Sequence, residues 1–328
     1  MAEPSSISSL TKILGTGVTI DVVDIGANPI DTDPPYQRLL QAGLARVTGF
    51  EPNPEALATL QANKGDNETY LPHAVADGET HEFKVCRKPG MSSLLEPNQE
   101  LLQYLNQFPD WGTVVRREKI NTVRLDDVSE VTNLDYLKID IQGGELCVFE
   151  NAPERLSKCV AIHSEVEFLP LYVDQPLFSE VELFLRGAGF LFHKFDPLTS
   201  RVLEPLASKT GTYEGLCQIF WADAVFIRDF TRFAELAPDK LMKLATILHD
   251  VYESFDLVLR TLSALDDQAG STYAGAYTAS PRRPTGRRQP IIRKNLDAAP
   301  VTQQPTWQPP VSVYDCAPTL CFEGLEAA

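Results

Sequence analysis

Positive charge is scarce in this chain. Its 328 residues include 29 lysines and arginines against 45 aspartates and glutamates, which gives a formal net charge of −16. A protein this acidic gains little by releasing counterions from a phosphate backbone. The charge therefore argues against DNA or RNA as a partner.

Long apolar runs and metal-ligand spacings are also missing. No stretch reaches the length of about 18 apolar residues that crosses a membrane, and residues 1–6 lack the basic start and apolar core of a secretory signal. The six cysteines contain no C-x-x-C pair, which is typical of reduced thiols in a cytoplasm. The five histidines show no H-x-H or H-x-x-x-H spacing, so no metal site is predicted. We expect a cytoplasmic protein, with pairing or metal binding by Cys316 and Cys321 as an open alternative.

Two short apolar runs that each end in an acid are the most informative feature. Residues 19–27 predict a buried strand with Asp24 at its carboxyl end and Gly26 at a tight turn. Residues 46–51 predict a second strand, which ends at Glu51. Ligands of open parallel sheets bind at the carboxyl ends of the strands, and a carboxylate there can accept hydrogen bonds from both hydroxyls of a ribose. The pattern predicts a nucleoside site.

The turn after the first strand separates two classes of nucleoside cofactor. A dinucleotide site favours G-x-G-x-x-G, because a pyrophosphate needs bare backbone at a helix N-terminus. Residues 26–31 contain one glycine, and Asp31 and Asp33 would repel a pyrophosphate. S-adenosylmethionine carries a sulfonium and an ammonium group and tolerates these acids. The turn favours it over a nicotinamide dinucleotide, while an ordinary strand–turn–helix without ligand stays open.

Strands and helices alternate over most of the chain, which predicts an α/β fold. Residues 88–118 interrupt the alternation and are a candidate lid or substrate wall. Apolar spacing predicts one helix over residues 241–262. Small and polar residues dominate from Asp266 onward, which predicts disorder. The expected organisation is an N-terminal extension over 1–17, a main domain over 18–230, a helical segment over 231–265 and a tail over 266–328.

Three segments resemble the FkbM family of methyltransferases. Residues 23–28 (VDIGAN) resemble its cofactor loop, residues 49–53 (GFEPN) its ribose segment, and residues 137–145 (LKIDIQGGE) its L-K-I-D-x-E-G-x-E signature. Residues 165–172 also fit, and the resemblance covers roughly residues 18–230. It implies a Rossmann-like class I methyltransferase sheet of order 3-2-1-4-5-7-6, with an antiparallel last strand and helices on both faces. It also implies S-adenosyl-L-methionine as methyl donor and O-methylation of a hydroxyl, often on a sugar, glycan or natural product.

The resemblance assigns most cofactor contacts to two loops. Asp24, Gly26 and Asn28 would face the methionine part of the cofactor. Glu51 and Asn53 belong to the segment that would hold the ribose, and Asn53 is also placed to cap the following helix.

Two further contacts and two departures follow from the same resemblance. Asp77 would approach the adenine amine, and Asp140 would lie near the methyl group. The second glycine of the family's first loop is replaced within residues 29–31, and Gln142 stands where the family has a glutamate. Whatever that glutamate does in the family is done here by a neutral amide.

Methyl transfer to a hydroxyl needs positioning and is helped by a general base. The strand predicted over residues 159–167 places His163, Glu165 and Glu167 on one face at period two. Ionisable groups on a central strand are costly to bury unless they are paired or used. We predict His163 as the base, with Glu165 as its orienter or as an alternative base and Asp140 as a further candidate. A purely structural hydrogen bond of His163 stays open.

Other functions were weighed against methyl transfer. A noncatalytic scaffold that has lost the cofactor is the main alternative, and the intact acids at the strand ends argue against it. A nicotinamide-dependent oxidoreductase is disfavoured by the single glycine, and an RNA methyltransferase by the charge. The predicted acceptor is therefore a small molecule or glycan with a hydroxyl group.

Overall fold

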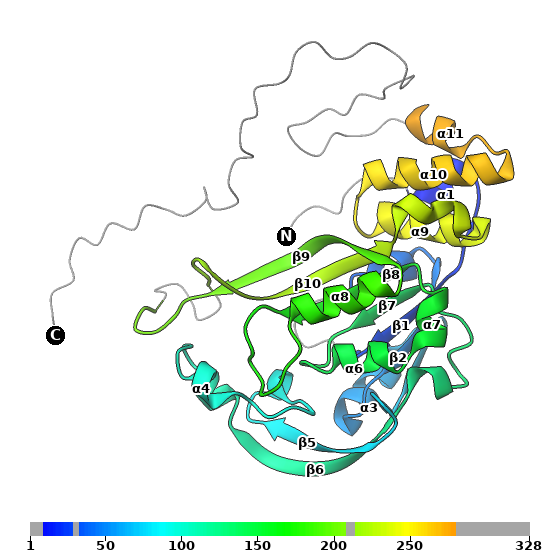
Figure 1. Cartoon of the computed structure of the whole chain (residues 1–328). Helices are drawn as coiled ribbons and strands as arrows, with labels where there is room; N and C mark the ends of the chain where they lie inside the picture. The colour runs from blue at the N-terminus through cyan, green and yellow to red at the C-terminus, as the bar shows by residue number, and fades with distance from the viewer. Residues whose placement is uncertain (1–8, 29–32, 208–213, 280–328) are drawn as a thin grey trace, which may run out of the picture.

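A seven-stranded sheet organises the computed structural model, which describes residues 9–28, 33–207 and 214–279 (Figure 1). From edge to edge the strands are β3 (Glu68–Leu71), β2 (Ala45–Phe50), β1 (Ile20–Ile25), β7 (Tyr136–Ile139), β8 (Ala161–Glu167), β10 (Gln218–Arg228) and β9 (Phe190–Arg201). Only β10 runs antiparallel to its neighbours. Counted within this sheet the order is 3-2-1-4-5-7-6, which confirms the predicted Rossmann-like methyltransferase topology.

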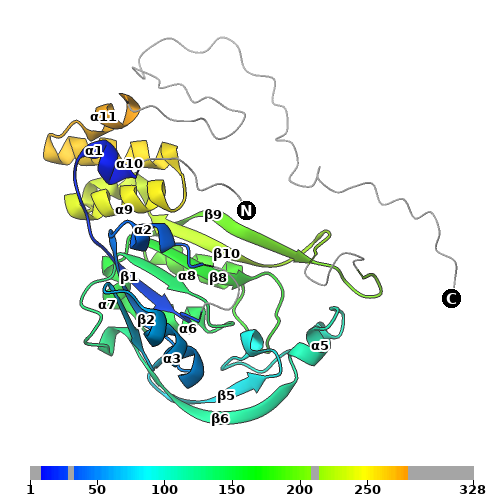
Figure 2. The same ribbon diagram turned by 180° about the vertical axis from the view of Figure 1, so that it is seen from behind.

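Helices cover both faces of the sheet (Figures 1 and 2). Side chains alternate between the faces along β1, so Ile20 and Val22 enter one core while Val23 and Ile25 enter the other. The first core is closed by α1 (Leu10–Leu14), α2 (Gln37–Gln41), α9 (Pro238–Asp250), α10 (Phe255–Ala269) and α11 (Tyr273–Ala279). The second is closed by α6 (Glu145–Glu150), α7 (Pro153–Lys158) and α8 (Phe178–Gly187).

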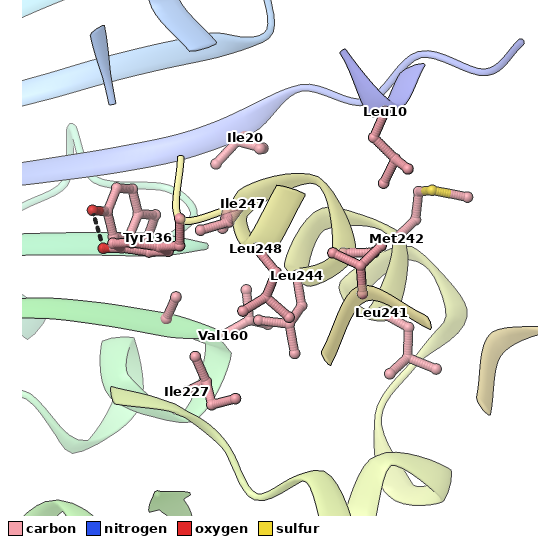
Figure 3. Close-up of a cluster of buried hydrophobic side chains, with 14 of the residues drawn as sticks. Leu10, Ile20, Tyr136, Val160, Ile227, Leu241, Met242, Leu244, Ile247 and Leu248 are labelled. Atoms are coloured by element: carbon pink, nitrogen blue, oxygen red, sulfur yellow. Dashed lines mark hydrogen bonds between the residues drawn. The ribbon is translucent and has the colours of Figure 1, made fainter. Parts of the chain in front are cut away.

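The C-terminal helices differ from the prediction. The single helix expected over 241–262 is wrong, because the chain breaks between α9 and α10 at Glu253, which has a φ of +51°. The apolar spacing continues across the break because both helices pack on one core; Figure 3 shows side chains of α9 facing Ile20, Tyr136 and Val160.

The boundary predicted at Asp266 is also displaced. Residues 266–279 are not tail but complete α10 and form α11, whose Tyr277 is buried. The N-terminal residues 1–8, the rest of the predicted tail (280–328) and Cys316 and Cys321 within it lie outside the described residues.

A second sheet of order β4-β6-β5 lies beside the first and contains β4 (Ala74–Val75), β5 (Thr80–Cys86) and β6 (Val114–Val123). β3 and β4 are only two residues apart in the chain but belong to different sheets. The 88–118 segment folds into η1 (Pro89–Met91), α4 (Gln99–Leu102), α5 (Phe108–Trp111) and the start of β6. Its apolar residues share a core with Tyr172 and Phe220, and bridges at Pro97–Tyr172 and Leu105–Leu203 fix it against the main domain.

The remaining elements are α3 (Pro54–Asn63), η2 (Leu125–Asp127) and η3 (Phe230–Glu235). Among the helices of the described ranges, none combines the length and apolar character needed to cross a membrane. The four cysteines in those ranges carry free thiols.

A buried ion cluster fastens α9 to the sheet. Asp135 is fully buried just before β7, and its two carboxylate oxygens accept hydrogen bonds from Lys240 at 2.6 Å and Lys243 at 2.7 Å. One of these oxygens also accepts from the backbone N–H of Asp21 at 2.9 Å. The cluster ties the helix to the amino ends of β1 and β7.

We expect Asp135→Ala to lower the free energy of unfolding by about 3–5 kcal/mol, because two partly buried ammonium groups lose their partner. Urea unfolding measures the change. In the control, Glu235→Ala removes a solvent-exposed pair with Arg232, and we expect it to cost about 0.5 kcal/mol or less. Equal costs in the two variants would contradict a stabilising role for the buried cluster.

Candidate functional site

The turn after β1 approaches the end of β7 so closely that only glycine fits. Gly26 has a φ of +80°, and a Cβ on it would lie 2.1 Å from the backbone oxygen of Asp140. The N–H groups of Gly26 and Ala27 both donate to the carbonyl of Phe50 at 3.1 Å. The ends of β1, β2 and β7 are thereby held together at one edge. Asn28 is half-buried, and the loop that follows it, residues 29–32, lies outside the described ranges.

Asp24 lies beneath this turn and is 2% exposed. The hydroxyl of Tyr36 donates to its Oδ2 at 2.6 Å, and Lys138 Nζ lies 3.3 Å from its Oδ1. Lys138 also donates to the carbonyl of Gly26 at 3.1 Å. Burial by itself lowers the pKa of Lys138, but the carboxylates of Asp24 and Asp140 raise it above its ordinary value. A half-buried cation therefore compensates Asp24.

Glu51 follows β2 and is 6% exposed. Its Oε1 accepts a hydrogen bond from the backbone N–H of Asn53 at 2.7 Å, and within the described ranges its Oε2 has no hydrogen-bond donor. Burial raises the pKa of Glu51, although the Asn53 N–H works in the opposite direction. The side chain of Asn53 is used locally, since its Oδ1 accepts from the N–H groups of Glu55 and Ala56 and caps α3.

Asp77 occupies the turn between β4 and β5. Its Oδ1 accepts hydrogen bonds from His81 at 2.8 Å and from the backbone N–H of Glu79 at 2.9 Å, and Thr122 lies 3.3 Å away. Desolvation by itself raises the pKa of Asp77, but these hydrogen-bond donors outweigh it and lower the pKa overall. Asp77 therefore stays ionised at the junction of the two sheets.

A cluster of carboxyl groups lies beyond the end of β7. Oxygens of Asp140, Glu145 and Glu165 lie within 4.8 Å of one another. The side-chain amide of Gln142 joins two of them, donating to Asp140 Oδ1 at 2.9 Å and to Glu165 Oε2 at 2.6 Å. Its own carbonyl oxygen accepts from the hydroxyl of Tyr172 at 3.1 Å. The family's glutamate position is thus occupied by the group that bridges the acids.

Burial and mutual repulsion favour the protonated forms in this cluster. Desolvation, followed by the charge of Asp140 and its neighbours, raises the pKa of Glu165 and of Glu167 well above the ordinary range. The pKa of Glu145 is raised to about 7, again chiefly by burial. The folded cluster therefore binds protons more tightly than isolated carboxyl groups do.

His163 is buried, and both of its ring nitrogens have partners. Its Nδ1 lies 3.1 Å from the hydroxyl of Tyr252, and its Nε2 lies 3.4 Å from Oδ2 of Asp223. Tyr252 in turn pairs with the hydroxyl of Tyr136 at 2.5 Å. No hydrogen bond or ion pair joins His163 to Glu165 in the part of the chain that the structure describes. The histidine is oriented by Asp223 and Tyr252.

The sequence analysis missed both of these partners. Asp223 is one charged residue inside an otherwise apolar strand, a pattern that could have drawn attention to it. Tyr252 lies in the break between α9 and α10, which the apolar spacing concealed. The predicted residues otherwise gather at the carboxyl edge of the main sheet, where Gly26, Asp140 and Glu165 lie close together.

Comparisons with known proteins agree with this arrangement. The sheet order and the edge site define a class I methyltransferase. A model of the methyltransferase FkbM domain matches residues 24–192, more than half of the chain, so the protein belongs to the FkbM methyltransferase family. Its methyl donor is S-adenosyl-L-methionine. No protein among the curated sequences matches.

Solved methyltransferase structures are similar to this chain at low identity and low TM-score. A putative methyltransferase from Thermoplasma acidophilum is 12% identical over 69% of this chain and 76% of its own, with a TM-score of 0.34. The precorrin-6y C5,15-methyltransferase of Geobacter metallireducens GS-15 is 13% identical over 66% and 83%, with a TM-score of 0.31. TrmK of M. capricolum, in complex with S-adenosyl-homocysteine, is 9% identical over 82% and 97%, with a TM-score of 0.31.

The residues at the edge fit the methyl donor. The Oε2 atom of Glu51 is available to a ribose hydroxyl, and Asp24, whose Oδ1 lies 3.3 Å from Lys138 Nζ, adds a second carboxylate at the end of β1. Acids at these two strand ends suit a diol and an ammonium group. The described site therefore has the acceptors that S-adenosylmethionine requires.

We expect Gly26→Ala to lower the free energy of unfolding by about 2 kcal/mol or more, because the added methyl meets the Asp140 carbonyl and a left-handed φ costs roughly 1–2 kcal/mol. Urea unfolding tests this. Gly90→Ala is the matched control, since a Cβ there has no neighbour within 4 Å among the described atoms. A harmless Gly26→Ala would show that the turn is not closely packed.

We expect Glu165→Gln to stabilise the chain at about pH 8 and to change nothing near pH 4. The raised pKa means that folded Glu165 retains its proton after the unfolded chain, with a pKa of about 4.3, has lost it. Wild-type stability therefore falls as pH rises through the folded pKa, and glutamine avoids that loss. Thermal unfolding between these limits measures the difference, and Glu150→Gln on the surface should show none.

Proposed function

We propose that this protein transfers the methyl group of S-adenosylmethionine to a hydroxyl of a sugar, glycan or other natural product. The observation that carries the proposal is Glu51, a buried carboxylate with one oxygen unengaged among the described residues, beside the Gly26 turn. A ribose diol is the complement of such a group. The methyl donor would then lie across the carboxyl ends of β1 and β2.

In this proposal the cofactor contacts are those at the strand ends. Their shared feature is an acceptor or a close backbone approach at the edge of the sheet, and they are Asp24, Gly26, Asn28, Glu51, Asn53, Asp77 and Asp140. The capping of α3 by Asn53 supports an indirect part for that side chain, since its N–H fixes the Glu51 carboxylate. The hydrogen bonds that keep Asp77 ionised support a contact with an amine.

Methyl transfer to a hydroxyl requires that the protein position the acceptor oxygen against the methyl group and provide a group that accepts the hydroxyl proton. S-adenosylmethionine, when bound, supplies an electrophilic methyl group on a sulfonium. We propose His163, Asp140 and Glu165 as the candidate proton acceptors. Asp140 directly follows β7, and the other two lie on the neighbouring strand β8. The raised pKa of Glu165 favours its protonated form, so His163 together with its partner Asp223 is the stronger candidate for the proton-accepting group.

The surroundings of the edge support a small acceptor. The 88–118 segment is anchored beside the acids, because Ser93 donates to the Gln142 carbonyl at 2.7 Å. It is suited to act as a substrate wall. The proposed cofactor and acceptor sites are built mainly from residues 18–230, and the helices within residues 231–279 would cover one face of the sheet. The free thiols of the described chain support a reducing cytoplasmic location.

Calorimetry with S-adenosylhomocysteine tests the cofactor assignment. We expect micromolar binding, no binding of NADH, and an affinity at least about tenfold weaker in Glu51→Ala, or about 1.4 kcal/mol, because the ribose loses its acceptor. Glu55→Ala, an exposed carboxylate in the next helical turn, should bind as the wild type does. No binding of either nucleotide would favour the noncatalytic scaffold, and unchanged affinity in Glu51→Ala would refute the ribose assignment.

A screen for methyl acceptors tests the reaction itself. Labelled S-adenosylmethionine would be incubated with the protein and a panel of hexoses, methyl hexosides and phenols. We expect alkali-stable label in at least one hydroxyl acceptor. Transfer to amine acceptors alone would contradict O-methylation while leaving the cofactor assignment intact.

A further inference from the structure

Asp223 lies on the same face of the sheet as the candidate acid–base residues. In the antiparallel register of β10 with β8, Asp223 is opposite Glu165 and Val225 is opposite His163. Directly opposed residues share a face, with Cβ atoms about 5 Å apart. Asp223 is therefore a third carboxyl in a row with Asp140 and Glu165, on a strand that carries no other acid.

Access distinguishes Asp223 from its histidine partner. The Asp223 side chain is 33% exposed, whereas that of His163 is 7% exposed. His163 is held from behind by Tyr252, whose ring stacks on the imidazole at an interplanar angle of 12°. A molecule entering from the carboxyl edge meets the aspartate first, and the histidine second.

Each element packed around the pair adds a charged or titratable group. Lys138 and Asp140 come from β7 and its end, Glu165 from β8, and Tyr252 from the break between α9 and α10. From β9, Lys194 pairs with Asp196 at 2.7 Å and donates to the carbonyl of Tyr252 at 3.2 Å. These groups leave Asp223 as the accessible carboxylate in contact with His163.

We propose that Asp223 is a catalytic residue that contacts the acceptor hydroxyl, and that His163 is the positioning residue behind it. This inference rests on the proposed function. As the hydroxyl oxygen bonds to the methyl carbon, the carbon–sulfur bond breaks and leaves its electron pair on sulfur. The hydroxyl proton passes to the Asp223 carboxylate. Nε2 of His163, which contacts Asp223 Oδ2, holds that carboxyl group in place. The acceptor becomes an ether, and the cofactor product is a neutral thioether.

The test compares Asp223→Asn with two reference variants, using the acceptor found in the labelled-methyl screen. We expect Asp223→Asn to lower kcat about a hundredfold or more, with KM and S-adenosylhomocysteine affinity within about threefold of wild type. Asp223→Glu should recover part of kcat. Asp239→Asn, which removes an exposed carboxylate from the first turn of α9, should leave kcat within about threefold.

The pH profile separates a chemical role from a structural one. A base must be unprotonated to accept the hydroxyl proton, so wild-type kcat should fall on the acid side of its pH profile. Asp223→Asn should lose this fall in kcat at low pH. Tyr252→Phe, which releases His163, should lower kcat about tenfold without changing KM. Unchanged kcat and pH profile in Asp223→Asn would overturn the proposal, as would equal losses in Asp239→Asn. If the wild-type protein methylates no hydroxyl acceptor, that result would instead contradict the proposed function.

Discussion

One half-buried lysine connects the ends of the central strands at the carboxyl edge of the main sheet. Lys138 is opposite Asp24 in the register of β1 and opposite His163 in that of β8, and its ammonium contacts both Asp24 and the carbonyl of Gly26. A cation at this depth persists because oxygens replace its lost hydration. The tight turn at Gly26 and the carboxylate of Asp24 are thus both held by one ammonium group.

The same register arranges charge in two rows across the sheet. Lys138, His163 and Lys194 lie in line, because Val225 of β10 is opposite both His163 and Lys194. Two residues nearer the edge come Asp140, Glu165 and Asp223. A row of cationic or basic side chains thus lies next to a row of acids. The positive charge of the first row offsets the repulsion between the carboxyl groups of the second.

The strand-end acids could be predicted because their signals are local, whereas the sheet order was implied by the resemblance to the FkbM family. An apolar run that ends in an acid and a glycine can be read without knowing its neighbours, as at Asp24 and Glu51. The break at Glu253 was concealed because the same apolar spacing serves two helices on one core. Asp223 and Tyr252 join the site only through antiparallel pairing and helix docking, which no local pattern encodes. Gln142 was recognised as a departure, but its bridge between two acids is a property of the folded chain.

The hydroxyl of Tyr172 donates to the carbonyl of Met91 and to the side chain of Gln142, each at 3.1 Å. One phenol therefore connects the wall built by the inserted segment to the amide that bridges the acids. Any change of that wall for a differently shaped acceptor would therefore also move the Gln142 amide, which is hydrogen-bonded to Asp140 and Glu165. In this scaffold, the choice of partner molecule and the tuning of acidity are not separate variables for evolution or for an engineer.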